Sequence, residues 1–111
     1  MKINNAVTAL SALAQASRLE IFRLLVQAGQ EGISAGGIGK RLELPLPTLS
    51  FHLSQLKNAG LVHCRREGRT LFYSADYGAM NALMAYLTEN CCQGQPETCA
   101  APTACVPKDR E

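Results

Sequence analysis

The sequence predicts a mostly helical domain of the α+β class, with five helices and a β-hairpin of two strands. Apolar residues recur with helical spacing along most of the first 60 residues and again after residue 76. Between these stretches, two short extended runs flank the turn signal Glu67-Gly68-Arg69. Hydrophobic residues make up 47% of the 111 residues and charged residues 18%, which is typical of one globular domain.

The first two helices are predicted from their apolar spacing. One covers residues 4–14, and the next begins at Ser17 and ends at Gly29. Ser17 and Glu20 fit a capping box, in which each side chain satisfies an exposed backbone N–H. The second helix is apolar over a wide arc, so we expect it at the centre of the core.

The next two helices are separated by a segment that contains two prolines. A short helix over 33–42 is weakened by three glycines. Pro45 and Pro47 exclude helix interior, and Pro47 suits the first turn of a helix over 47–59. Three leucines should turn this helix toward the core: Leu49, Leu53 and Leu56.

After Gly60 the periodicity changes to that of strands. Extended runs over 61–66 and 70–74 form the hairpin. Asp76 is a suitable N-cap for a last helix that reaches residue 89 or 90. We therefore divide the chain into a folded domain, residues 1–90, and a cysteine-rich C-terminal tail, residues 91–111.

Positive charge is concentrated in the middle of the chain. The net charge is +2, yet residues 40–70 carry six basic and two acidic side chains. Such a concentration suits a surface that binds phosphates, and an ordinary solvated basic surface is the alternative.

We expect a cytoplasmic protein that makes no contact with a membrane and is not an enzyme. No apolar run approaches the roughly 20 residues that span a bilayer, and the first residues lack a signal-peptide pattern. The sequence offers no nucleophile–base pair and no phosphate-binding loop.

The order of elements is that of a winged helix-turn-helix protein, which binds double-stranded DNA. The helix over 47–59 would lie in the major groove, where hydroxyl and amide groups bond base edges and Phe51 fits a thymine methyl. Lys57 and the arginines of the hairpin would bind phosphates or the minor groove. The candidate DNA-binding residues are Thr48, Ser50, Phe51, His52, Ser54, Gln55, Lys57, Arg65, Arg66 and Arg69.

Alternatives to DNA contact stay open for some of these residues. His52 is equally well explained as a hydrogen-bonded structural histidine. Phe51 could pack on the partner helix or on the scaffold instead, and the arginines could be ordinary surface charge.

Three segments together resemble the ArsR/SmtB-type repressors. They are residues 13–25 (LAQASRLEIFRLL), 48–62 (TLSFHLSQLKNAGLV) and 65–69 (RREGR), and the resemblance covers residues 4–89. It implies a homodimer joined by the first and last helices and an operator of inverted repeats. It also implies repression without ligand and release from DNA when a metal or metalloid binds.

Four of the five cysteines lie in the last 21 residues: Cys91, Cys92, Cys99 and Cys105. In a reducing compartment, clustered thiols act as metal ligands or redox groups more often than as disulfides. Adjacent residues on a helix do not share a face, so Cys91 and Cys92 converge only if the helix ends near Asn90. Cys64, beside His63 in the first strand, is interpreted as a small buried hydrophobe.

Two ligand sites of these repressors are missing here. Residues 31–37 contain no cysteine, which removes the thiol site near the third helix, and residues 76–89 contain no histidine for a zinc site. The terminal cluster resembles the C-terminal arsenite site of one ArsR branch.

The resemblance thus implies arsenite, As(III), or antimonite, Sb(III), as the inducer. Its ligands would be Cys91, Cys92 and Cys99, with Cys105 as an alternative third ligand or a spare. The sequence therefore predicts a metalloid-responsive repressor. A thiol-based redox-sensing repressor is the alternative.

Overall fold

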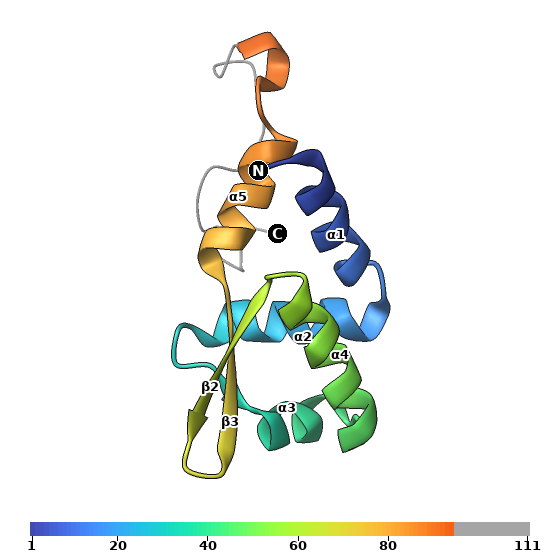
Figure 1. Cartoon of the computed structure of the whole chain (residues 1–111), viewed down its shortest axis with the longest axis vertical. Coiled ribbons are helices and arrows are strands. Elements are labelled where there is room, and N and C mark those ends of the chain that lie inside the picture. Colours follow the sequence, from blue (N-terminus) through green and yellow to red (C-terminus); the bar gives the residue numbers. More distant parts are fainter. Residues whose placement is uncertain (95–111) are drawn as a thin grey trace, which may run out of the picture.

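The computed structural model describes residues 1–94, which form a helical body with a projecting β-hairpin (Figure 1). Five α-helices, three strands and one 3-10 helix occur in this part of the chain. In chain order they are α1 (Ile3–Leu13), α2 (Ala16–Ala28), β1 (Ile33–Ser34), α3 (Ala35–Leu42), α4 (Leu46–Asn58), β2 (Val62–Glu67), β3 (Thr70–Ala75), α5 (Tyr77–Leu87) and η1 (Cys91–Gly94).

The five α-helices and the hairpin confirm the predicted fold class, with a correction at the start of α2. The side chain of Gln15, not Ser17, caps this helix by accepting a hydrogen bond from the Arg18 N–H at 2.9 Å. Ser17 already lies inside the first turn, so the predicted capping box is wrong. Gly29 follows α2 with a φ of +85°, as a helix-terminating glycine can.

The sheet has three strands rather than the predicted two. All are antiparallel in the order β1-β3-β2, and Ile33 pairs with Tyr73 while Cys64 also pairs with Tyr73 from the other side. Gly32 precedes β1 with a φ of +77°, and a Cβ there would lie 2.3 Å from the carbonyl oxygen of Tyr73. Only glycine therefore lets β1 come this close to β3.

The core lies between α2, α4 and the base of the hairpin. Ile21 and Leu25 of α2 are completely buried, which confirms the central position of this helix. The three leucines of α4 are buried as predicted. The fully buried large side chains are Ile21, Leu25, Ile38, Leu49, Leu53, Leu56 and Leu61.

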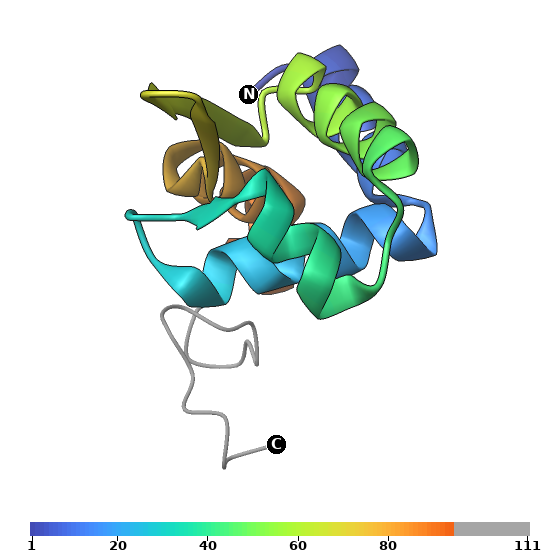
Figure 2. The same cartoon turned by 90° about the horizontal axis from the view of Figure 1, so that it is seen from below.

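Helix α1 buries a side that carries only small residues. Ala6, Ala9 and Ala12 are buried, and α1 lies beside α4 (Figure 2). Val7 and Leu10, which share the helical spacing seen in the sequence, are exposed on the opposite side. Val7 and Leu10 are thus left without cover within residues 1–94, whereas Leu13 at the end of α1 packs against the core.

Among the described residues, no helix has both the length and the apolar character needed to cross a membrane. Cys99 and Cys105 lie outside the described residues. The division of the chain into residues 1–90 and 91–111 stays a prediction.

Candidate nucleic-acid interface and cysteine segment

A tight turn positions α4 against α3. Ser34 caps α3 by accepting a hydrogen bond from the Gly37 N–H at 3.0 Å, and Glu43 ends α3 in the left-handed conformation with a φ of +53°. Pro45, in the extended conformation, is the N-cap residue that precedes α4. A Cβ on Gly39 would lie 3.3 Å from the carbonyl oxygen of Leu44, so a glycine here allows close packing at the turn. The result is a helix-turn-helix unit whose second helix is α4.

The outward side of α4 carries six of the predicted DNA-binding residues. Phe51 is 58% exposed, so the alternative that it packs on the scaffold does not hold within this chain. Its ring centroid lies 5.8 Å from that of His52. Their contact with DNA stays a prediction; the six exposed residues are Thr48, Ser50, Phe51, Ser54, Gln55 and Lys57.

His52 does not share this exposure. It is only 7% exposed, and its Nδ1 lies 3.3 Å from an Nη of Arg18. A guanidinium only donates, so Nδ1 accepts, which places the proton of the neutral ring on Nε2. Arg18 Nε also donates to the carbonyl oxygen of Ala12 at 2.7 Å. His52 therefore fits the structural alternative: with Arg18 it links α4 to α2 and to the end of α1.

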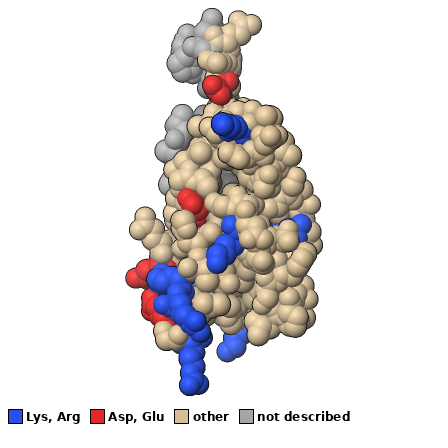
Figure 3. All heavy atoms as spheres, viewed as in Figure 1, with Lys and Arg blue, Asp and Glu red and all other residues tan. Residues whose placement is uncertain are grey.

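The three hairpin arginines differ in their surroundings. Arg65 is held within the protein: its guanidinium bonds Glu67 at 2.5 Å and the carbonyl oxygen of Glu31 at 3.2 Å, and lies over the ring of Phe72. Arg66 and Arg69 are exposed near the end of the hairpin, where Figure 3 shows Lys and Arg side chains gathered. These two are better placed than Arg65 to meet a phosphate backbone.

The start of α5 is bonded to two other elements. Asp76 caps α5, as predicted, by accepting from the Ala79 N–H at 2.9 Å, and its other oxygen lies 3.1 Å from Nε2 of His63 in β2. The hydroxyl of Tyr77 donates to the carbonyl oxygen of Val26 at 2.8 Å, at the end of α2. The start of α5 is thereby fixed to both α2 and the hairpin.

The end of α5 leads into the cysteine segment. The helix ends at Leu87, earlier than predicted, because Thr88 bonds back to Met84 and Asn90 turns into the left-handed region with a φ of +57°. In η1 the Sγ atoms of Cys91 and Cys92 lie 3.6 Å apart. The two sulfurs thus converge after the end of a helix. As predicted from the sequence, Cys91 and Cys92 need such a helix end if they are to share one ligand. No group of three metal-ligating side chains occurs within residues 1–94.

Cys64 lies apart from this segment, in β2 opposite Tyr73. Its thiol is free and half-buried, so it is less enclosed than a core hydrophobe. Burial, together with the neighbouring Cys64 thiol, raises the pKa of Tyr73.

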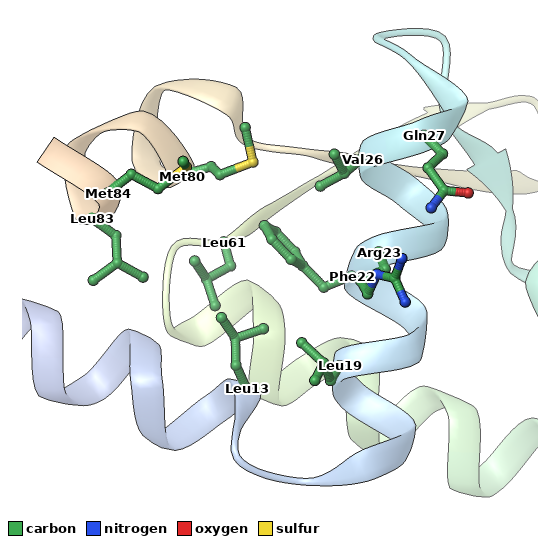
Figure 4. A pocket seen from close by; sticks show the side chains of 10 residues that line it. All are labelled: Leu13, Leu19, Phe22, Arg23, Val26, Gln27, Leu61, Met80, Leu83 and Met84. Carbon is green, nitrogen blue, oxygen red and sulfur yellow. The ribbon is translucent and has the colours of Figure 1, made fainter. Parts of the chain in front are cut away.

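A pocket of about 300 Å³ lies between α2 and α5 (Figure 4). Phe22 from α2 and Met80 and Leu83 from α5 lie around it. Its lining is apolar apart from Arg23 and Gln27, so its walls hold no acid–base or nucleophile–base pair.

Comparisons with known proteins agree with this geometry. A family model described as a helix-turn-helix domain matches residues 13–65. The transcriptional activator HlyU of Vibrio cholerae is 36% identical over 88 residues, which is 79% of each chain. The chain belongs to the ArsR/HlyU-type transcriptional regulators.

Two solved structures of such regulators share the fold. Reduced HlyU from Vibrio cholerae has a TM-score of 0.62 at 34% identity, covering 81% of this chain and 92% of that one. A homodimeric winged helix-turn-helix DNA-binding domain from Mycobacterium bovis, described as a possible ArsR-family regulator, has a TM-score of 0.63 at 28% identity. This match covers 84% of this chain and 86% of that one. In this regulator α3 and α4 therefore form the helix-turn-helix, and β2 and β3 form the wing.

Sequence reasoning missed the positioning residues of the regulator. Arg18 has no role of its own in the sequence analysis, Tyr77 belongs to the apolar pattern of the last helix, and Arg65 is among the predicted DNA contacts. The partners that tie them to other elements lie 34 to 52 residues away in the sequence, so no local signal indicates those contacts.

The buried His52 predicts a pH dependence of stability. Burial first, and the positive charge of Arg18 second, hold the pKa of His52 below its ordinary value of 6.5. On acidification the unfolded chain binds this proton before the folded protein does, so His52 lowers the free energy of unfolding as the pH falls below about 6.5. Above that pH the contribution is constant.

Urea unfolding at pH 7.5 and 5.5 measures this effect. We expect a smaller loss of stability between the two pH values in His52→Gln than in the wild-type regulator. Equal losses in the two proteins would contradict the assignment to His52.

Proposed function

We propose that this regulator is a metalloid-responsive repressor. As a homodimer in the cytoplasm it binds operator DNA when unliganded, and trivalent arsenic or antimony releases it. The observation that carries the proposal is the 3.6 Å separation between the Sγ atoms of Cys91 and Cys92. A third thiolate would come from Cys99 or Cys105, both outside the described residues.

The chemistry of the two thiols fits a soft, thiophilic centre. Thiolates are soft ligands, and metal–thiolate bonds such as zinc–sulfur are about 2.3 Å long, so two sulfurs on one centre lie at most about 4.6 Å apart. The separation of 3.6 Å lies within that limit. Cys92 is also exposed, which lets a ligand approach from solvent.

The exposed apolar side chains of α1 and α5 support a homodimer. Ile3 and Val7 on α1 and Met84 and Leu87 on α5 are exposed large hydrophobics. The homodimeric relative from Mycobacterium bovis has the same fold. Pairing through these helices would place two copies of α4 in successive major grooves, roughly 34–36 Å apart.

The anchored start of α5 supports a route from thiols to DNA. The hydroxyl of Tyr77 holds this helix to α2, and Asp76 holds it to β2 through His63. Ligation beyond the other end of α5 would shift a helix that the dimer and the wing share. A coupling of about 1–3 kcal/mol, or about 5–150-fold in affinity, is typical of allosteric proteins.

Operator binding in the presence of different inducers tests the proposal. A duplex selected from a random library is labelled, and fluorescence anisotropy is measured with arsenite, zinc chloride or hydrogen peroxide in parallel. We expect arsenite to weaken binding and zinc to leave it unchanged. Unchanged binding with arsenite would contradict metalloid sensing.

A thiol-based redox-sensing repressor is a second candidate, favoured by the same sulfur pair. Two sulfurs 3.6 Å apart are also close enough to react with each other on oxidation. In the experiment above, release by peroxide that a dithiol reverses, without release by arsenite, would favour this candidate.

The exposed wing arginines should contribute to DNA affinity through phosphates. We expect Arg66→Ala and Arg69→Ala each to weaken binding to all DNA sequences and to reduce the slope of log affinity against log salt by about 1. Anisotropy titrations between about 50 and 200 mM salt measure this slope, because counterion release lowers the affinity strongly over that range.

Arg65→Ala provides the matched comparison, because Arg65 already bonds Glu67 and Glu31. It should change the salt slope less than the other two substitutions. An equal reduction for all three would contradict the distinction between Arg65 and its neighbours.

A further inference from the structure

The outward side of α4 has Phe51 at its centre. With about 3.6 residues per turn, the exposed Ser54 and Gln55 lie roughly 60° and 40° to either side of Phe51. Leu49, Leu53 and Leu56 occupy the opposite side and are buried. A helix with this orientation in a major groove meets the bases first with an aromatic ring.

Positive charge is absent from the part of this outward side that surrounds Phe51. Lys57 is the only charged residue in the α4 sequence, and it points about 120° away from Phe51. Arg18, the cation nearest to α4 in the hydrogen-bond network, is held by His52 and by Ala12. Figure 3 shows the same contrast, with blue side chains at the end of the wing and an uncharged surface over the lower part of α4.

These side chains favour A·T pairs over G·C pairs. Guanine is read most often by Arg or Lys, whereas apolar side chains contact the methyl group of thymine and Gln bonds adenine through N6 and N7. Phe51 and Gln55 are four residues apart and so lie next to each other on the helix. Together they match two neighbouring A·T pairs.

We infer that Phe51 is a specificity-determining residue that reads the 5-methyl group of a thymine in each operator half-site. This inference rests on the proposed operator binding. The DNA that it predicts has half-sites in which the base pairs under α4 are A·T. The wing and Lys57 contribute to affinity by contacting phosphates, and Phe51 determines the base specificity.

Selection from a random duplex library, with the full-length protein and no arsenite, tests the base preference. We expect thymine at one fixed position of each enriched half-site with wild-type protein. Phe51→Ser should lose the preference at that position, and Phe51→Leu, which keeps an apolar contact, should retain it. Enrichment of G·C pairs under α4, or an unchanged preference in Phe51→Ser, would overturn the inference.

Deoxyuridine in place of that thymine removes only the methyl group. We expect one such substitution to weaken wild-type binding about fourfold, the effect of one buried methyl-sized group. Phe51→Ser should bind the thymine and deoxyuridine duplexes equally, and thermal melting checks that this exposed substitution leaves the fold intact. Equal sensitivity in both proteins would also overturn the inference.

The two proposals fail in different ways. If no sequence is enriched at all, the proposed operator binding is wrong, and so is the proposed repressor function. If a sequence is enriched and arsenite releases the protein, but deoxyuridine has no effect, only the role of Phe51 fails.

Discussion

Replacing both Cys91 and Cys92 by serine is expected to abolish the response to arsenite while operator affinity stays within about twofold of wild type, as for other surface substitutions. The reason is that the two Sγ atoms lie 3.6 Å apart beyond the end of α5, away from the helix-turn-helix. Serine oxygen is a poor ligand for a soft centre. Anisotropy titrations of labelled operator with and without arsenite measure both quantities.

Cys64→Ser is the matched control for this experiment. Cys64 lies in β2, opposite Tyr73, and not in the cysteine segment. It should release DNA with arsenite as wild type does. Release of the Cys91→Ser/Cys92→Ser protein by arsenite would remove this pair from the site, and Cys99→Ser compared with Cys105→Ser identifies the third thiolate.

Gly32→Ala is expected to destabilise the folded protein by about 3 kcal/mol, which lowers the melting temperature by roughly 12–24 °C. A Cβ at this position meets the carbonyl oxygen of Tyr73 at 2.3 Å, and backbone atoms cannot yield as a flexible side chain does. The left-handed backbone adds about 1–2 kcal/mol for any residue other than glycine. Thermal melting at equal protein concentrations measures the loss, since a dimer melts in a concentration-dependent way.

Gly60→Ala separates the two causes. Gly60 has a φ of +76°, close to that of Gly32, but a Cβ there has no neighbour within 4 Å. It should therefore show only the backbone cost of about 1–2 kcal/mol. If both variants melt at the same temperature, the close approach of β1 to β3 does not limit the substitution at Gly32.

The helices could be predicted because their apolar spacing is a property of the local sequence. Leu49, Leu53 and Leu56 fall on one side of α4 at any position in the fold, and Asp76 is a preferred cap residue. The predicted start of α2 is wrong because Ser17 is a preferred N-cap residue, whereas Gln15, which caps the helix, is not. The exposed residues of α4 were identified for the same local reason.

Contacts between distant segments could not be predicted in this way. Strand β1 has only two residues, too few to show an alternating pattern, and its pairing depends on Gly32. The structural role of His52 depends on its contact with Arg18, which lies on another helix, 34 residues earlier. For the same reason Arg65 was grouped with Arg66, although its guanidinium is held by Glu31 across the fold.

The contacts at the start of α5 have a consequence for protein engineering. Tyr77 and Asp76 bond α5 to α2 and to β2, whereas the thiol pair lies after Leu87. Exchanging the chain beyond Leu87 for a ligand-binding segment of another chemistry leaves these bonds in place. The helix-turn-helix and the wing are therefore a suitable DNA-binding scaffold for biosensors whose inducer is chosen by the designer.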